Sequence, residues 1–169
     1  MNKILKKTLE FEGGYVDNPH DRGGATNHGI TEEVARAYGY EGDMKDLPKE
    51  TAVDIYKERY VDPLLDDLNS EKLQLLVFDA SVNHGQKWGI KFLQRAYNTL
   101  NKDTIAEDGI LGSQTVGAVN RYSNQTDLAF WCLIVRGQYF RDIVKNDSSQ
   151  KTFIRGWGNR IESLMKEVL

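Results

Sequence analysis

The sequence predicts a mainly α-helical protein that contains one small irregular or β segment near residues 13–31. Apolar residues recur at helical spacing through most of the chain, and Gly, Pro, Asn and Asp gather between the periodic stretches. Residues 13–31 break this pattern, with five glycines and one proline. Long irregular segments inside compact domains usually carry function, so a site is expected there.

The first predicted helix covers residues 2–12. Ile4, Leu5, Leu9 and Glu12 fall on one of its faces, and Gly13-Gly14 ends it. The polar, Gly-rich segment that follows predicts no regular element by its periodicity.

Further helices are predicted near residues 32–38, 48–61, 71–84, 87–100 and 113–122, and from a cap at Asp127 to about 145. Ser70 is expected to cap the 71–84 helix and Gly85 to end it. A last helix, capped by Ser148 or Ser149, has an apolar face made of Phe153, Ile154, Trp157, Ile161, Leu164, Met165 and Val168. Trp88, Phe92, Trp131 and Trp157 are predicted to be core residues.

Length and charge limit the domain organisation and the partners. A chain of 169 residues with 40% apolar residues forms one well-packed domain or two small parts. The polar stretch 101–112 is the candidate boundary, and we expect parts at 1–86 and 87–169 that pack as one compact monomer. The net charge of −3 argues against nucleic acid as a partner, because phosphate contacts need surplus Lys and Arg.

Cys132 is the single cysteine, and it lies in the apolar run 128–135. We expect a buried structural thiol and no disulfide. The run is too short to cross a bilayer, and membrane insertion is not expected. Lys6, Lys7 and Glu10 interrupt the apolar stretch that a signal peptide needs, so no export signal is visible.

Glu12 is the candidate general acid. It shares the apolar face of its helix, and partial desolvation of a carboxyl raises its pKa. Hydrolysis of a glycosidic bond at neutral pH needs a protonated acid beside the leaving oxygen. Taken alone, a Glu at the end of a helix is more often a surface residue.

Asp21 and Thr26 complete the candidate catalytic set. Asp21 lies beside Arg22 and two glycines, a polar setting that keeps a carboxylate ionised, and Thr26 offers a hydroxyl for a water molecule. The simpler interpretations are a turn residue for Asp21 and a helix cap for Thr26 or Thr31.

Several blocks of the sequence resemble glycoside hydrolase family 108, a family of N-acetylmuramidases. The first is Glu12-Gly-Gly-Tyr followed by Asp21-x-Gly-Gly-x-Thr26-x-x-Gly-Ile-Thr31. The others are Ile55-Tyr-Lys-Glu-Arg-Tyr-Val-Asp-Pro63, Phe78-Asp-Ala-Ser-Val-Asn-His-Gly85, Leu93-Gln-Arg-Ala with Asp108-Gly-Ile-Leu-Gly-x-x-Thr115, and Gly156-Trp-Gly-Asn-Arg160. The last two blocks resemble the peptidoglycan-binding-like half found with that family. The Glu-Asp-Thr order is also similar to that of phage-type lysozymes, in which one more residue separates Asp from Thr.

The resemblance implies a lysozyme-like fold and hydrolysis of the β-1,4 bond between N-acetylmuramic acid and N-acetylglucosamine in peptidoglycan. It places the catalytic glutamate at Glu12. No cofactor is expected, because no set of metal ligands with a sensible spacing is present in the sequence. The resemblance also implies a phage or prophage endolysin, made in the host cytoplasm and released to the wall through a holin or similar route.

Other polar and aromatic residues are candidates for substrate binding, namely Tyr15, His28 and Asn83. Asn83 is equally well placed to bind a sugar acetamido group or to cap its helix. Tyr56 and Tyr60, four residues apart, fit the core better than a sugar-stacking role.

Two other functions stay open. His20, His28 and His84 with Asp21 are the residues that a zinc-dependent amidase or peptidase would use, although no HExxH spacing is present and no metal is expected. The loop at Asp108 lacks the alternating acidic ligands of a calcium site and is expected to be a structural turn. A wall-binding module without catalysis is the second alternative.

Overall fold

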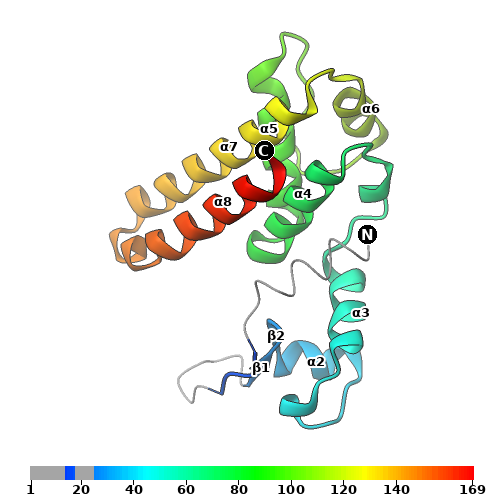
Figure 1. The fold of residues 1–169 in the computed structure, drawn as a ribbon, viewed down its shortest axis with the longest axis vertical. Helices are drawn as coiled ribbons and strands as arrows, with labels where there is room; N and C mark the ends of the chain where they lie inside the picture. The colour runs from blue at the N-terminus through cyan, green and yellow to red at the C-terminus, as the bar shows by residue number, and fades with distance from the viewer. Residues whose placement is uncertain (1–13, 18–24) are drawn as a thin grey trace. The chain divides into compact units, whose positions relative to one another are not determined.

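The computed structural model describes residues 14–17 and 25–169, and the chain divides into two compact units, Met1–Val61 and Asp62–Leu169. The predicted helix at 2–12 lies outside the described residues. Within them, seven α-helices and one two-stranded sheet confirm the mainly α class (Figure 1). No described helix is long and apolar enough to cross a membrane.

The described part of the first unit holds the sheet, two helices and a 3-10 turn. Strands β1 (Thr26–Asn27) and β2 (Ile30–Thr31) lead directly into α2 (Glu32–Tyr38), and η1 (Met44–Asp46) precedes α3 (Lys49–Tyr60). Thr31 caps α2 by accepting from the Val34 amide, as the sequence allowed. Pro48 is the residue before α3, whose predicted range was one residue longer at each end.

The second unit is helical throughout its regular structure. After η2 (Leu65–Asp67) come α4 (Glu71–His84), α5 (Gln86–Leu100), α6 (Ser113–Arg121), α7 (Gln125–Asn146), η3 (Ser148–Phe153) and α8 (Ile154–Val168). Helix α4 packs against α5 and α7, and α7 and α8 lie side by side (Figure 1). Ser70 caps α4 and Gly85 ends it with a φ of 83°, both as predicted.

Two predicted caps are wrong. Helix α7 begins earlier than Asp127, because the Asn124 side chain accepts from the Asp127 amide and adds a turn. Neither Ser148 nor Ser149 caps α8. Instead, Asp147 accepts from the Ser149 amide and starts η3, which runs into α8 without a side-chain cap.

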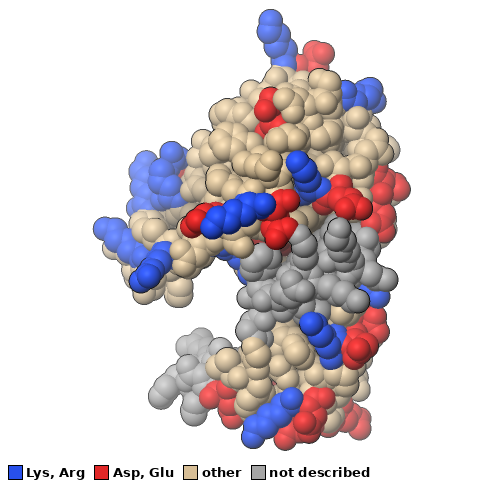
Figure 2. Space-filling view, in the orientation of Figure 1, with Lys and Arg blue, Asp and Glu red and all other residues tan. Residues whose placement is uncertain are grey.

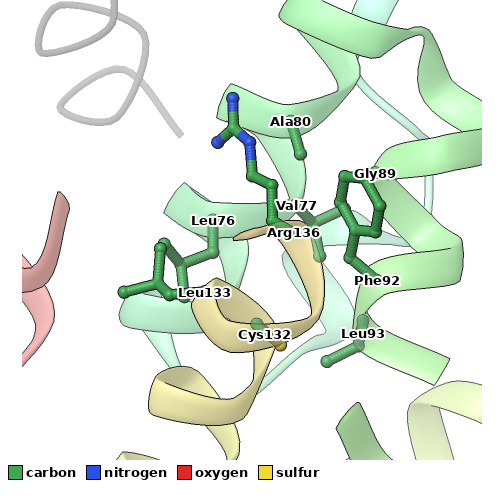
Figure 3. A pocket seen from close by; sticks show the side chains of 9 residues that line it. All are labelled: Leu76, Val77, Ala80, Gly89, Phe92, Leu93, Cys132, Leu133 and Arg136. Atoms are coloured by element: carbon green, nitrogen blue, oxygen red, sulfur yellow. The ribbon is translucent and has the colours of Figure 1, made fainter. Parts of the chain in front are cut away.

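The core of the second unit lies where α4, α5 and α7 meet. Gly89 lets α5 approach α4, since a Cβ there would come within 2.6 Å of the Val77 carbonyl oxygen. A cavity of about 10 Å³ remains, lined by residues of the three helices including Cys132 (Figure 3). That volume holds a single water molecule at most.

Cys132 is buried, as predicted, and burial raises the pKa of its thiol far above its ordinary value. The prediction that three tryptophans and Phe92 are core residues is wrong in part. Phe92 is buried, but Trp88, Trp131 and Trp157 are each half-buried. An indole is too large to be covered completely in a unit of this size.

Candidate active site

The described part of the candidate site is a small hairpin. Thr26 lies opposite Thr31 and Asn27 opposite Ile30, while His28 and Gly29 form the two-residue turn. Both turn residues have positive φ angles, 51° and 74°, which is the geometry of a type I′ turn. The β character of this segment was predicted, but the hairpin was not; the signal that could have indicated it is the glycine-containing pair between Thr-Asn and Ile-Thr.

Two buried side chains fix the hairpin to the rest of its unit. The Asn27 amide donates to the carbonyl oxygens of Met44, at 2.7 Å, and Lys45, at 3.1 Å. The Tyr56 hydroxyl donates to the His28 carbonyl oxygen at 3.0 Å. Tyr56 is therefore a core residue and not a sugar platform. The role of Asn27 was not predicted from the sequence, because its partners are 17 and 18 residues away.

A third piece of extended backbone joins the hairpin at Thr26. The Val16 and Thr26 amides each donate to the other's carbonyl oxygen, at 2.8 and 2.7 Å. Val16 follows Glu12 by four residues in the sequence.

The Thr26 side chain is half-buried, and no other described residue hydrogen-bonds to its hydroxyl. Its backbone is held from both sides by Val16 and Thr31. The hydroxyl thus projects from a backbone that is hydrogen-bonded on both sides, and none of the residues that the structure describes uses its hydrogen-bonding capacity. Glu12 and Asp21 lie outside the described residues, and their catalytic roles stay predictions.

Tyr15 stands beside the bridge with a half-buried ring. Lys45 Nζ lies 5.4 Å from the ring centroid, and the hydroxyl donates to Asp17 at 3.4 Å. Desolvation, and then the Asp17 carboxylate, raise the pKa of Tyr15, so the phenol is neutral. Its substrate role and that of His28, half-buried in the turn, stay predictions.

Asn83 and His84 belong to the second unit, at the end of α4. The Asn83 amide donates to the Asp79 carbonyl oxygen at 2.8 Å, and Gly85 forms the end of the helix. Asn83 is therefore not the cap, and its acetamido-binding role stays a prediction. His84 Nε2 accepts from Arg136 Nε at 3.2 Å. Burial, and then the Arg136 charge, lower the pKa of His84 to about 4.

A buried ion cluster links three helices of this unit. Asp79 is fully buried, and its two carboxylate oxygens accept from Arg136 and from Arg160, each at 2.6 Å. Arg136 is itself buried, and burial lowers the pKa of its guanidinium while the Asp79 carboxylate opposes that change. The cluster joins the sequence blocks 78–85 and 156–160, which are 81 residues apart at the Asp79–Arg160 contact.

Gln94 organises the loop that precedes α6. This buried side chain donates to Asp108 Oδ1, to the Ile110 carbonyl oxygen and to the Thr115 hydroxyl, at 2.9 to 3.2 Å. It also accepts from the Gly109 amide at 2.9 Å. The Asp108 loop is therefore a structural turn, as predicted. Gln94, which belongs to the sequence block 93–96, stabilises it through these hydrogen bonds.

No group of three or more metal-ligating side chains stands together among the described residues. Of the zinc alternative's candidate ligands, His20 and Asp21 lie outside them, and His84 Nε2 accepts a hydrogen bond from Arg136.

Comparison with known proteins assigns both halves of the chain. Residues 5–85 match the model of the glycosyl hydrolase 108 family, and residues 88–162 match that of a predicted peptidoglycan domain. No curated protein matches significantly. Among solved structures, Brucella abortus SagA is similar, with a TM-score of 0.76 and 28% sequence identity over 99% of this chain and 92% of that one.

Neither family model is that of a zinc amidase or peptidase, and nothing in these comparisons supports that alternative. The first model covers the irregular segment and the hairpin, and the second begins at Trp88 on α5. Residues 5–85 therefore form a glycosyl hydrolase 108 domain, and the protein is a lysozyme-like glycoside hydrolase that acts on peptidoglycan.

Proposed function

We propose that this hydrolase is an N-acetylmuramidase, which cuts the β-1,4 bond between N-acetylmuramic acid and N-acetylglucosamine. The observation that carries the proposal is the Val16–Thr26 bridge. It holds Thr26, whose hydroxyl has no hydrogen-bond partner among the described residues, next to Val16, which follows Glu12 by four residues in the sequence. The family match over residues 5–85 supplies the reaction class.

In the proposed mechanism Glu12 is the general acid. Its proton goes to the glycosidic oxygen, so that the N-acetylglucosamine side leaves as an alcohol and positive charge builds on the anomeric carbon of the muramic residue. Asp21 stays ionised and stabilises that charge or helps to activate water. A water molecule held by Thr26 supplies the hydroxyl that completes hydrolysis.

Mass spectrometry of digested peptidoglycan tests this assignment. Purified sacculi are digested, and the products are reduced with borohydride so that the new reducing end carries a label. We expect reduced N-acetylmuramic acid at the new ends and the same yield after exhaustive EDTA treatment. New N-acetylglucosamine ends, or new amino groups without new reducing ends, would contradict the proposal.

The resemblance also leads us to propose that the protein serves as a phage endolysin, made in the cytoplasm and released through a holin. Expression in a bacterial host tests this. Cells that make the enzyme alone should stay intact, and co-expression of a holin should cause rapid lysis. Cells that co-express the holin with a Glu12→Gln variant should not lyse rapidly. Lysis that does not depend on the holin would contradict this proposal.

A further inference from the structure

The apolar face of α8 is buried along its C-terminal half and open along its N-terminal half. Leu164 and Val168 have no exposed surface, whereas Ile154, the first residue of α8, and Phe153, the last residue of η3, are 50% and 52% exposed. An exposed patch of adjacent large apolar side chains marks a surface that binds a ligand or a partner. The sequence alone predicted one continuous buried stripe.

A groove of about 350 Å³ lies between this open stretch and α7. Trp157 and Phe140 form its aromatic wall, stacked with ring centroids 4.6 Å apart. Arg141 lines it as the one charged residue, and the remaining lining residues are Gly137, Val144, Ile154, Gly158 and Ile161. The volume lies in the range of small-ligand sites.

Gly158 is the informative residue of the lining. It lies inside α8, where glycine is among the least favourable residues. A Cβ built at Gly158 meets no heavy atom within 4 Å. Packing of the described residues therefore does not require glycine at this position, and the same is true of Gly156, which lies in the same helix but does not line the groove. At Gly158, which does line it, close approach of an external ligand is a physical reason for glycine.

The charge around the groove favours an anionic ligand. The segment 141–155, which connects α7 to α8, carries four basic residues (Arg141, Lys145, Lys151 and Arg155) and two acidic ones (Asp142 and Asp147). Its net charge is therefore +2 in a chain whose net charge is −3. Figure 2 shows blue side chains gathered where α7 passes into α8 in Figure 1.

Two parts of peptidoglycan could bind in this groove, namely the sugar rings and the lactyl–peptide arm. Sugar hydroxyls need hydrogen-bond partners when they are desolvated, and the lining side chains offer only two donor groups, the Arg141 guanidinium and the Trp157 indole N–H, and no acceptor oxygen. One face of the Trp157 indole is already covered by Phe140. The lactyl–peptide arm instead combines methyl groups with carboxylates, which match an apolar floor and a basic rim.

We propose that the groove between α7 and α8 binds the lactyl–peptide arm of peptidoglycan. This inference rests on peptidoglycan being the substrate, and it gives the domain at 88–162 a defined contact surface. The methyl groups lie against Trp157 and Ile161. A ligand carboxylate pairs with Arg141, which it shares with or takes from the exposed Asp142 carboxylate that accepts from Arg141 at 2.8 Å.

The test fills the groove without disturbing the unit. Gly158→Leu and, as a matched control on the solvent-exposed face of the same helix, Asn159→Leu are made in a Glu12→Gln background that does not digest its ligand. Each is sedimented with intact sacculi and with glycan strands whose stem peptides an amidase has removed. Thermal unfolding and the oligomeric state are measured in parallel.

We expect Gly158→Leu to have a Tm equal to or above that of its parent and to bind intact sacculi about tenfold more weakly. Asn159→Leu should bind as the parent does, and the stripped glycan should bind the two variants equally. Unchanged binding by Gly158→Leu, an equal loss on stripped glycan, a lower Tm, or a dimer that the variant breaks would each overturn the inference. Reducing ends released by the unmutated enzyme report on the muramidase assignment separately, so the two failures are distinguishable.

Discussion

The two units of this protein differ in the interactions that stabilise each of them internally. The described hairpin of the first unit is fixed by side chains that bond to backbone, with Asn27 and Tyr56 as its anchors. The second unit is held by a helical core and by buried polar side chains that bond to one another, above all Asp79, Arg136 and Arg160. The candidate catalytic residues thus lie in the first unit and the buried ion cluster in the second, so we expect substitutions in one to leave the other intact.

Removal of part of the helical core should have the largest effect on stability. A chain cut to residues 1–86 keeps α4 but loses α5 and α7, the helices against which α4 packs. The buried residues of α4, such as Leu73 and Phe78, would then face water. We expect aggregation or no cooperative unfolding transition by circular dichroism. A soluble, cooperatively folded and fully active fragment would contradict the division of roles.

Asp79→Asn should have the next largest effect, because it leaves the buried Arg136 without its counter-charge. We expect a loss of about 3 kcal/mol in the free energy of unfolding, measured by urea denaturation. Asp142→Asn is the control, since its pair with Arg141 is exposed and worth less than about 1 kcal/mol. Equal stability of the two variants would show that the buried cluster does not matter.

His84 should make stability depend on pH. Its pKa of about 4 in the folded protein is below the ordinary 6.5, so the unfolded chain binds the proton first. The stabilising contribution of the neutral ring is present above pH 6.5 and is lost as the pH falls towards 4. We expect a loss of about 1–2 kcal/mol, discounted because the ring is partly exposed.

Urea denaturation at pH 7 and pH 4.5 measures this loss, and His84→Gln isolates it. The glutamine oxygen can still accept from Arg136, but it does not titrate. The variant should therefore lose less stability between the two pH values than the wild type does. Identical losses would assign the pH dependence to other groups.

Substitutions of the two threonines that face each other across the hairpin should have the smallest effects on stability. The two variants should differ in activity. Thr26→Val keeps the β-branched shape and removes the hydroxyl. We expect a change within about 0.5 kcal/mol in stability and a roughly tenfold loss of activity. Thr31→Val removes the α2 cap, and should cost about 1 kcal/mol with activity retained. If Thr26→Val is fully active, Thr26 does not position water.

The sequence predicted helix boundaries well where residues of the helix itself and its flanking residues determine them. Helices α2 and α4 begin and end at their predicted residues, and Ser70 and Gly85 flank α4 as expected. The cap of α7 was misplaced because Asn124 and Asp127 are both good capping residues, and nothing in the sequence ranks them. The His28–Gly29 turn was missed because two-residue strands carry too little periodicity.

Long-range contacts were beyond sequence reasoning. The Asp79–Arg160 pair spans 81 residues, and neither residue belongs to a pattern that names its partner. The apolar stripe of α8 was visible, but its open N-terminal half depends on what α7 leaves uncovered. In the candidate site, Thr26 is placed by a bridge to Val16, while the roles of Glu12 and Asp21 rest on the motif.

The most direct test of the central claim is a paired measurement on Glu12→Gln. The substitution removes the proposed acid and keeps the size of the side chain. Lysis of sacculi should fall by about 10²-fold or more, while the Tm and circular dichroism spectrum stay those of the wild type. A folded Glu12→Gln protein that keeps more than half of its activity would contradict the account.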